Sequence, residues 1–485
     1  MQKSNVKKNT IFNTVKTVFG IIYPLITFPY ISRVLMAENV GKVNFGNSIV
    51  SYFSLIASLG VSTYAIRECS KVRDNQEELN KTASQIFSIN IISTLISYFA
   101  LVITLIVARP LENYRELICI QSATILFTTL GADWINSAME DFKYIAVRTT
   151  GMQLVSLALM FLFVRRPEDY IKYAVISVVA SSGANIINIF YRRKFCKTRF
   201  TTHMDIRKHL PPILLMFSMI LSQTIYTNSD TTILGLLRGD YEVGLYSTAV
   251  KIYHLVNTMI ASVSLVVMPQ LSSGFAKKNY QEVNGLLKYS LNFIIVLGLP
   301  CIIGVNAIAL PIVDVLAGAE FYDAVTALHI LTITLSFSLL GGWFGNMTML
   351  PAGREKMCLL SCGVSALVNI ILNIILIPLF GLNAAATTTA IAECVGLIVL
   401  FRHRDRNIKV SNLKDMLKAP IIGSCGIAFV ALIVRSFINS YPVICVVTII
   451  LSVIVYGSTL ILMKNEFAMS FIKPILNSKH SNMSA

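Results

Sequence analysis

Residues 357–380 read MCLLSCGVSALVNIILNIILIPLF, a run without a single Lys, Arg, Asp, Glu or His. A helix of about 20 mainly apolar residues is long enough to cross the hydrocarbon core of a membrane. Within the run, Ser365, Asn369 and Asn373 recur every four positions and therefore share one face of such a helix. This stretch predicts a membrane-spanning helix that carries a polar stripe.

Similar apolar stretches fill most of the 485 residues. Only 14% of the residues are charged and the mean hydropathy is +0.67, whereas soluble proteins carry about 25% charged residues. A soluble enzyme, a DNA-binding protein and a disordered scaffold are therefore excluded. The sequence predicts an all-α polytopic membrane protein with about fourteen transmembrane helices, at 11–36, 43–64, 83–108, 114–138, 143–164, 169–191, 211–237, 243–269, 288–316, 323–350, 357–380, 382–401, 416–438 and 441–463.

The net charge of +16 is explained by where the basic residues lie. Fourteen spans place both termini on one side of the membrane, and the loops on that side then hold 30 Lys and Arg residues against 9 in the opposite loops. Basic loop residues concentrate on the cytoplasmic side of membrane proteins. We therefore expect both termini in the cytoplasm and no nucleic-acid partner.

Two stretches of the sequence resemble each other. TILFTTLGADWINSAM at 124–139 and TLSFSLLGGWFGNMTM at 334–349 agree at six positions when they are offset by 210 residues. Chance similarity between apolar segments is the alternative explanation. A repeat predicts two six-helix lobes related by pseudo-two-fold symmetry along the membrane normal, around a central cavity. The expected parts are an N-terminal lobe (1–197), a basic cytoplasmic linker (198–208), a C-terminal lobe (209–404), and a C-terminal helix pair with its tail (405–485).

Polar side chains within the spans point to that cavity. Polar residues in a span usually face the interior of a helix bundle or a water-filled space. Hydrogen bonds between neighbouring helices are the alternative role for Ser and Asn. Stripes in both halves of the chain favour the cavity, and the candidate lining residues are Asn47, Ser51, Asn185, Asn369 and Asn373.

Ionisable residues within the spans form the second set of candidates, since each is costly in a membrane and needs a reason. Basic groups in a cavity attract anions such as phosphate and pyrophosphate, and the candidates for this role are Lys16, Arg33 and Lys251. Groups that couple transport to an ion, or that make the cavity polar, are Asp133, Asp230, His254 and Glu393. Interfacial placement of Arg33 and Asp133, and a structural ion pair between Asp230 and Lys251, are the alternatives.

Catalytic motifs are missing from the sequence. It contains no Walker A motif, no GxSxG, no HExxH and no paired histidines at metal-ligand spacing. The loops are also too short for a separate catalytic domain. We therefore expect no enzyme activity, no catalytic residues, no metal site and no cofactor, and transport is the class that remains.

The junctions between the first two spans of each predicted lobe carry a family resemblance. FPYISRVLMAENVGKVNFGNSIVSYF (28–53) and NSDTTILGLLRGDYEVGLYSTAVKI (228–252) resemble the Wzx-type oligosaccharide flippases. These form the polysaccharide biosynthesis (O-antigen transporter) family of the multidrug/oligosaccharidyl-lipid/polysaccharide exporter superfamily. The similarity runs through roughly 400 residues. Arg33 falls on the family's SRVL motif, and its second-lobe motif is matched by Asp230, Gly235, Gly239, Gly244 and Tyr246.

The resemblance implies a fold and a function. Such proteins have two six-helix lobes around a cavity, often followed by two further helices, and many members have twelve spans. They move undecaprenyl-pyrophosphate-linked oligosaccharide repeat units from the cytoplasmic to the outer leaflet by alternating access, for O-antigen, capsule or exopolysaccharide synthesis. The implied partners are this lipid-linked oligosaccharide, membrane lipids, a proton or sodium gradient, and the polymerase and chain-length proteins of polysaccharide assembly.

Two other functions stay open at this point. A multidrug extruder of the same superfamily would need a carboxylate in the lobe that binds cationic drugs. The first span holds Lys16 and no acidic residue, which argues against this alternative. The third interpretation is a scaffold for a polysaccharide assembly complex that transports nothing itself.

Overall fold

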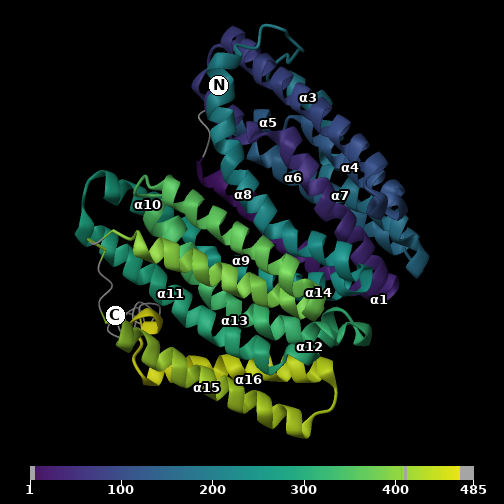
Figure 1. Ribbon diagram of the computed structural model, residues 1–485. Helices are drawn as coiled ribbons and strands as arrows, with labels where there is room; N and C mark the ends of the chain where they lie inside the picture. The colour runs from purple at the N-terminus through teal and green to yellow at the C-terminus, as the bar shows by residue number, and fades with distance from the viewer. Residues whose placement is uncertain (1–5, 406, 409–411, 470–485) are drawn as a thin grey trace, which may run out of the picture. The chain divides into compact units, whose positions relative to one another are not determined.

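The structure is a computed structural model that describes residues 6–405, 407–408 and 412–469 (Figure 1). The rest of the predicted tail, 470–485, lies outside the described residues. In the described part the chain folds into helices joined by short turns, without a strand, which confirms the all-α membrane fold. The helices are α1 (Val6–Ser58), α2 (Val61–Lys71), α3 (Gln76–Val107), α4 (Arg115–Gly131), α5 (Trp134–Ala138), α6 (Phe142–Phe163), α7 (Tyr170–Tyr191), α8 (Ile206–Arg238), α9 (Asp240–Ala261), α10 (Val263–Ala276), α11 (Tyr280–Ala307), α12 (Ala309–Leu316), α13 (Ala324–Gly342), α14 (Glu355–Arg402), α15 (Leu413–Phe437) and α16 (Tyr441–Leu462).

The predicted number of fourteen spans is not confirmed. Among the described residues, ten helical segments are long and apolar enough to cross a membrane, or eleven if the bent pair of α9 and α10 is one span. The difference arises partly because α1 and α14 each run through a junction where the sequence predicts two separate spans. Helix α4, with 17 residues, is also shorter than a full span.

Both long helices change direction at a single residue. Helix α1 leaves helical geometry at Met36 (φ 65°, ψ 171°), after Pro24 and Pro29. Helix α14 does so at Gly381 (φ 56°), three residues after Pro378. Proline removes a backbone hydrogen bond and bends a helix, and glycine takes a positive φ without steric cost. Each long helix therefore consists of two arms.

The chain divides into two compact units, 1–244 and 245–485. In the first unit, α1 packs against α3, α4, α6 and α8, while α7 packs against α4 and α6. A buried cluster that includes Tyr64, Ile86, Trp134 and Ile213 joins α2, α3, α5 and α8. The predicted lobe boundaries around 198–208 differ from this division by contacts, and they stay a prediction.

In the second unit, α11 packs against α13 and α15, α13 against α14, and α15 against α16. The last two helices are attached to this unit by buried contacts. The Tyr456 hydroxyl on α16 donates to the Val296 carbonyl of α11 at 2.6 Å. Trp343, fully buried after α13, donates from Nε1 to Ser290 Oγ at 3.0 Å. Helix α11 is therefore the central support of this unit.

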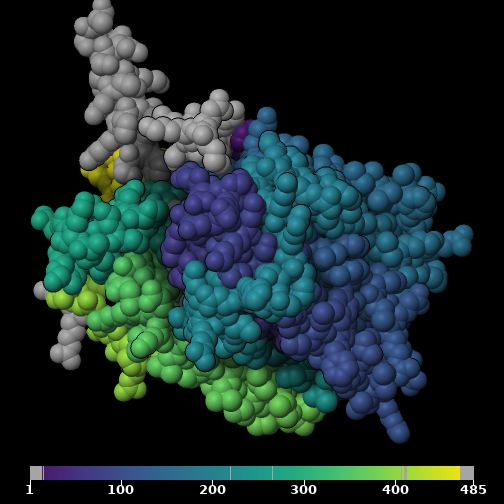
Figure 2. All heavy atoms as spheres, turned by 90° about the horizontal axis from the view of Figure 1, so that it is seen from above, coloured from purple at the N-terminus to yellow at the C-terminus, as the bar shows by residue number. Residues whose placement is uncertain are grey.

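The predicted linker does not cross open solvent; residues 197–203 form an extended strap along α3. Two residues of extended chain span about 6.6 Å and four residues of helix about 6.0 Å, so alternate amides of the strap can meet every fourth side chain of the helix. The bonds run from Lys197 N to Asn80 Oδ1 (2.8 Å), from Arg199 N to Ser84 Oγ (3.1 Å) and from Thr201 N to Ser88 Oγ (2.8 Å). In Figure 2 an indigo part of the chain lies at the surface beside blue-green residues that come later in the sequence.

We expect the double variant Ser84→Ala/Ser88→Ala to be cleaved by trypsin at Lys197 and Arg199 roughly thirtyfold faster than the wild type, because the two lost hydrogen bonds together contribute about 2 kcal/mol. Limited proteolysis of the purified protein measures the rate. The control is Ser177→Ala/Ser181→Ala, since these hydroxyls bond to carbonyls within α7. Equal cleavage of all three proteins would show that the hydrogen bonds to Ser84 and Ser88 do not hold the strap on α3.

Candidate functional site

The two motif stretches meet in the first unit, at the bend of α1 and the start of α9. A Cβ placed on Gly41 would lie 1.8 Å from the Asp240 carbonyl oxygen, and a Cβ on Gly244 would lie 2.0 Å from the Ala37 carbonyl oxygen. The contact is reciprocal, because each junction supplies one glycine and one carbonyl. Only glycine allows the two backbones to approach this closely. Gly41 and Gly244 are therefore packing positions.

Aromatic side chains close this junction. The Tyr114 hydroxyl donates to Asp240 Oδ1 at 2.7 Å, and burial together with this carboxylate raises the pKa of Tyr114. The Phe45 ring lies edge-on to Tyr114, with 4.8 Å between centroids, and covers Gly235, where a Cβ would lie 2.2 Å from the ring. The neutral Tyr114 side chain therefore stabilises the position of the acidic start of α9 next to the Phe45 region of α1.

The candidate cations lie at separate places. Lys16 is half-buried on α1, and no hydrogen bond or ion pair of its side chain occurs among the described residues. Arg33 is exposed on the same helix and donates from Nη1 to the Pro29 carbonyl at 2.9 Å. Seventeen residues of helix separate the two by about 25 Å. Lys251, on α9 of the second unit, is half-buried. One diphosphate therefore cannot touch Lys16 and Arg33 together.

Asp133, at the end of α4, forms an ion pair with Arg148 Nη2 of α6 at 2.5 Å. The Arg148 side chain is 3% exposed and lies over the Tyr144 ring, 5.2 Å from its centroid. Arg148 is therefore a buried cation within a helix and not a loop residue. The sequence carries no local signal for this pair, since a turn and the short α5 separate the partners.

The other acidic and histidine candidates differ in exposure. Asp230 on α8 is buried, Glu393 on α14 is half-buried, and His254 on α9 is exposed beside the Tyr253 ring. Outside the spans, Asp314 accepts a 2.6 Å hydrogen bond from Tyr322. This bond raises the pKa of Tyr322 to about 12. His254 is thus the candidate most open to its surroundings.

The stripe of α14 joins the two arms of that helix. Asn373 Nδ2 donates to Asn369 Oδ1 at 3.0 Å, and Thr388 Oγ1 on the other arm donates to Asn373 Oδ1 at 2.5 Å. Ser365 donates to the Ala392 carbonyl at 2.9 Å, also on the second arm. Both asparagines are fully buried. This placement matches the alternative role of hydrogen bonding between helices rather than the lining of a cavity.

The stripe residues of the first unit are more accessible. Asn47 is exposed, Ser51 is half-buried with its hydroxyl on the Ser48 carbonyl, and Asn185 is half-buried. Asn188, one turn after Asn185, is instead buried and donates to the Gly131 carbonyl at 2.8 Å. Asn47, Ser51 and Asn185 are therefore the polar candidates that a ligand could reach.

Sequence reasoning also missed a buried histidine. His209, at the start of α8, is fully buried, with Nδ1 2.8 Å from the Tyr64 hydroxyl and Nε2 3.1 Å from Gln85 Oε1. Gln85 in turn donates from Nε2 to the His203 carbonyl of the strap at 3.0 Å. His209 directly follows the predicted linker 198–208, and α2, α3 and α8, which enclose it, are brought together only by the fold.

The sequence of this chain is similar to those of known proteins. The family model for "Polysaccharide biosynthesis protein" matches residues 6–275. A relative from Shigella dysenteriae, named "Putative O-antigen transporter", is 22% identical over 408 residues, which cover 82% of this chain and 98% of that protein. Its name is that of a transporter and not of an enzyme, as the lack of catalytic motifs predicts.

Solved structures share the fold. The lipid II flippase MurJ in an inward closed conformation has a TM-score of 0.74 at 20% identity, covering 96% of this chain and 99% of that one. An inward-facing multidrug resistance transporter of the MATE family, in the MOP superfamily, has a TM-score of 0.55 at 14% identity, covering 79% and 96%. The family match extends over more than half of the chain and includes both motif junctions. This multi-pass membrane protein therefore belongs to the polysaccharide biosynthesis protein family.

Proposed function

We propose that the protein is a flippase that moves undecaprenyl-pyrophosphate-linked oligosaccharide units from the cytoplasmic to the outer leaflet by alternating access. The observation that carries this proposal is the match to an O-antigen transporter along nearly the whole length of that relative. The likeness to the lipid II flippase is a likeness of fold, and it is compatible with the same kind of cargo.

In this proposal Lys16, Arg33 and Lys251 bind the pyrophosphate. Cations on apolar helices are costly unless they meet an anion, and a diphosphate is well matched by lysine and arginine. Because about 25 Å of helix separates Lys16 from Arg33, the headgroup contacts them at successive stages of its passage. The sugars lie against accessible polar side chains such as Asn47, Ser51 and Asn185.

A proton or sodium gradient drives the cycle in this proposal. Asp133, Asp230, His254 and Glu393 are the candidate coupling groups, and His254 combines exposure with a charge that changes near neutral pH. The lobes are 1–197 and 209–404, with both termini in the cytoplasm of a bacterial cell and the protein in its inner membrane. Polymerase and chain-length proteins would receive the exported units.

A multidrug extruder is the second candidate, because a MATE transporter shares the fold. The first arm of α1 supplies Lys16 and no carboxylate, which disfavours cationic drugs. Expression in a drug-sensitive strain separates the two functions. Drug resistance without restored polysaccharide export would replace the flippase proposal with this one.

The proposal is tested by export of surface polysaccharide in a bacterial strain that lacks its own flippase. We expect the triple variant Lys16→Ala/Arg33→Ala/Lys251→Ala to export at least about tenfold less than the wild type, because each charge-assisted hydrogen bond contributes about 1.5–3 kcal/mol. Lys356→Ala is the control, since Lys356 is exposed at the start of α14. Wild-type export by the triple variant at normal abundance would contradict the role of these cations.

A further inference from the structure

The second unit contains a polar pocket at one end of its last two helices. It has a volume of about 400 Å³ and is lined by the start of α15, the end of α16 and the side of α11. Both α15 and α16 are long and apolar enough to span a membrane, so the pocket lies at the level where lipid headgroups meet water. None of its residues belongs to the candidate transport site.

A buried acceptor at the pocket has no partner. Asn292 of α11 is only 5% exposed, and its Oδ1 accepts no hydrogen bond from any residue that the structure describes. A buried polar atom without a partner costs about 1–3 kcal/mol, so such a position calls for a ligand that donates. Asn465 has its Oδ1 occupied by the amides of residues 467 and 468. Asn292 is thus the position in the pocket wall that requires a donor.

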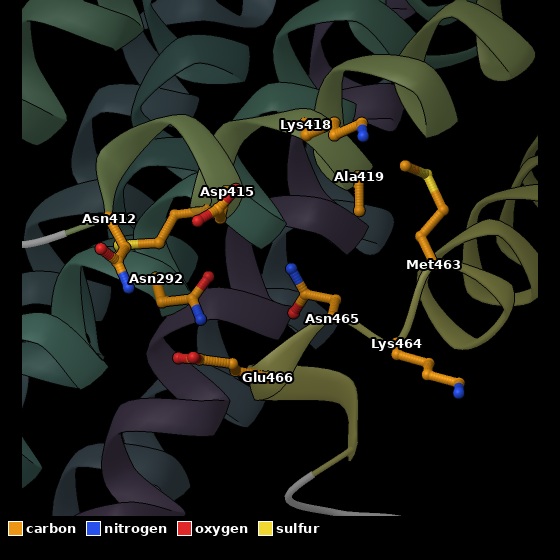
Figure 3. A pocket seen from close by; sticks show the side chains of 10 residues that line it. Asn292, Asn412, Asp415, Lys418, Ala419, Met463, Lys464, Asn465 and Glu466 are labelled. Atoms are coloured by element: carbon orange, nitrogen blue, oxygen red, sulfur yellow. The ribbon is translucent and has the colours of Figure 1, made fainter.

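Charges around Asn292 identify the kind of donor. Figure 3 shows Asp415, Glu466 and Asn292 around a common space, with the ammonium ends of Lys418 and Lys464 directed away from it. Glu466 also pairs with Lys288 at 2.6 Å, on α11. Carboxylates and an amide oxygen around one space favour a cation with N–H groups. The two lysines at the rim favour an anion beside it.

We propose that this pocket binds the headgroup of a phospholipid that carries a primary ammonium group, such as phosphatidylethanolamine. The ammonium donates to Asn292 Oδ1 and to the Asp415 carboxylate, and the phosphate lies outside the acidic space, at the rim that carries Lys418 and Lys464. A polyprenyl pyrophosphate fits less well, because its several negative charges would face Asp415 and Glu466. This inference does not depend on the proposed transport function.

Apolar side chains beside the pocket suit the acyl chains of such a lipid. Leu462, next to the lining residue Met463, is 81% exposed, and Ile421 and Ile422 lie exposed on α15 one turn beyond Lys418. A headgroup in the pocket would therefore place its chains along the apolar outer surface of α15 and α16. The acyl chains of the lipid therefore need no tunnel inside the protein.

The test is native mass spectrometry of the purified protein with an equimolar mixture of phosphatidylethanolamine and phosphatidylcholine of identical chains. Phosphatidylcholine keeps the positive charge but has no N–H donor, so we expect roughly tenfold more bound phosphatidylethanolamine. Asn292→Leu and Asp415→Asn should each bring the ratio close to one. Asp74→Asn, at an exposed aspartate between α2 and α3, should keep the wild-type ratio.

Two further measurements use the wild-type protein and therefore test the proposal even if a variant folds poorly. On the wild type, stepwise N-methylation of the lipid should weaken binding in order, with the largest loss at the trimethyl form. Equal binding of both lipids by the wild type, or an unchanged ratio in a folded Asn292→Leu protein, would overturn the proposal. Tighter binding of soluble glycerophosphoethanolamine than of the lipid would also overturn it, because the ligand would then be a water-soluble amine.

Discussion

Gly41→Ala is expected to abolish polysaccharide export and to lower the amount of folded protein in the membrane. The added methyl group would lie 1.8 Å from the Asp240 carbonyl oxygen, about half of a van der Waals contact distance of about 3.5–4.0 Å. The obstacle is backbone, so no side-chain rotation relieves it. Overpacking of this kind costs about 1–3 kcal/mol or more.

Gly244→Ala should have the same effect, because its Cβ would meet the Ala37 carbonyl oxygen at 2.0 Å. Gly151→Ala is the matched control, since a Cβ at this helical position in α6 meets nothing within 4 Å. Export and membrane abundance of the three variants are measured side by side. Full export by Gly41→Ala would mean that the two junctions do not approach each other as described.

The second large effect is expected at the Asp133–Arg148 pair. Asp133→Ala leaves the Arg148 guanidinium, 3% exposed, without its carboxylate. Removing one partner of a buried ion pair costs about 3–5 kcal/mol; Asp133 is itself 37% exposed, so we expect the lower end, about 3 kcal/mol. Thermal unfolding of the protein in detergent, followed by intrinsic fluorescence, reports the loss.

A double variant separates charge from packing at this site. Asp133→Ala/Arg148→Met removes the uncompensated cation while keeping a long apolar side chain against Tyr144, so it should be more stable than Asp133→Ala alone. Asp323→Asn, which changes a charge at the start of α13, serves as the matched control. If Asp133→Ala unfolds at the wild-type temperature, the pair contributes nothing to stability.

The class of fold follows from local properties of the sequence. Long apolar runs such as 357–380 predict membrane helices because each helix satisfies its own backbone hydrogen bonds. The number of spans does not follow in this way, because a run of apolar residues does not show whether helix geometry continues across a junction. At Met36 and Gly381 it resumes at once, so two predicted pairs became single bent helices.

The candidate site could be predicted only in part. The spacing of Asn369 and Asn373 correctly indicated a shared face, but their partner Thr388 lies on the other arm of α14. The partner decides whether a polar stripe lines water or joins helices. Lys16 and Arg33 were identified as unusual cations near opposite ends of the predicted span 11–36, and the structure keeps this arm of α1 helical up to Met36.

By itself, the sequence determined the membrane class, the helical periodicities and the motif glycines, since these depend on residue type and on spacing within one helix. Only the tertiary structure decided which distant atoms meet: Gly41 with Asp240, Asp133 with Arg148, and the strap amides with α3. Such contacts depend on how helices pack in space, and a packing partner far along the chain leaves no trace in the local pattern of residues.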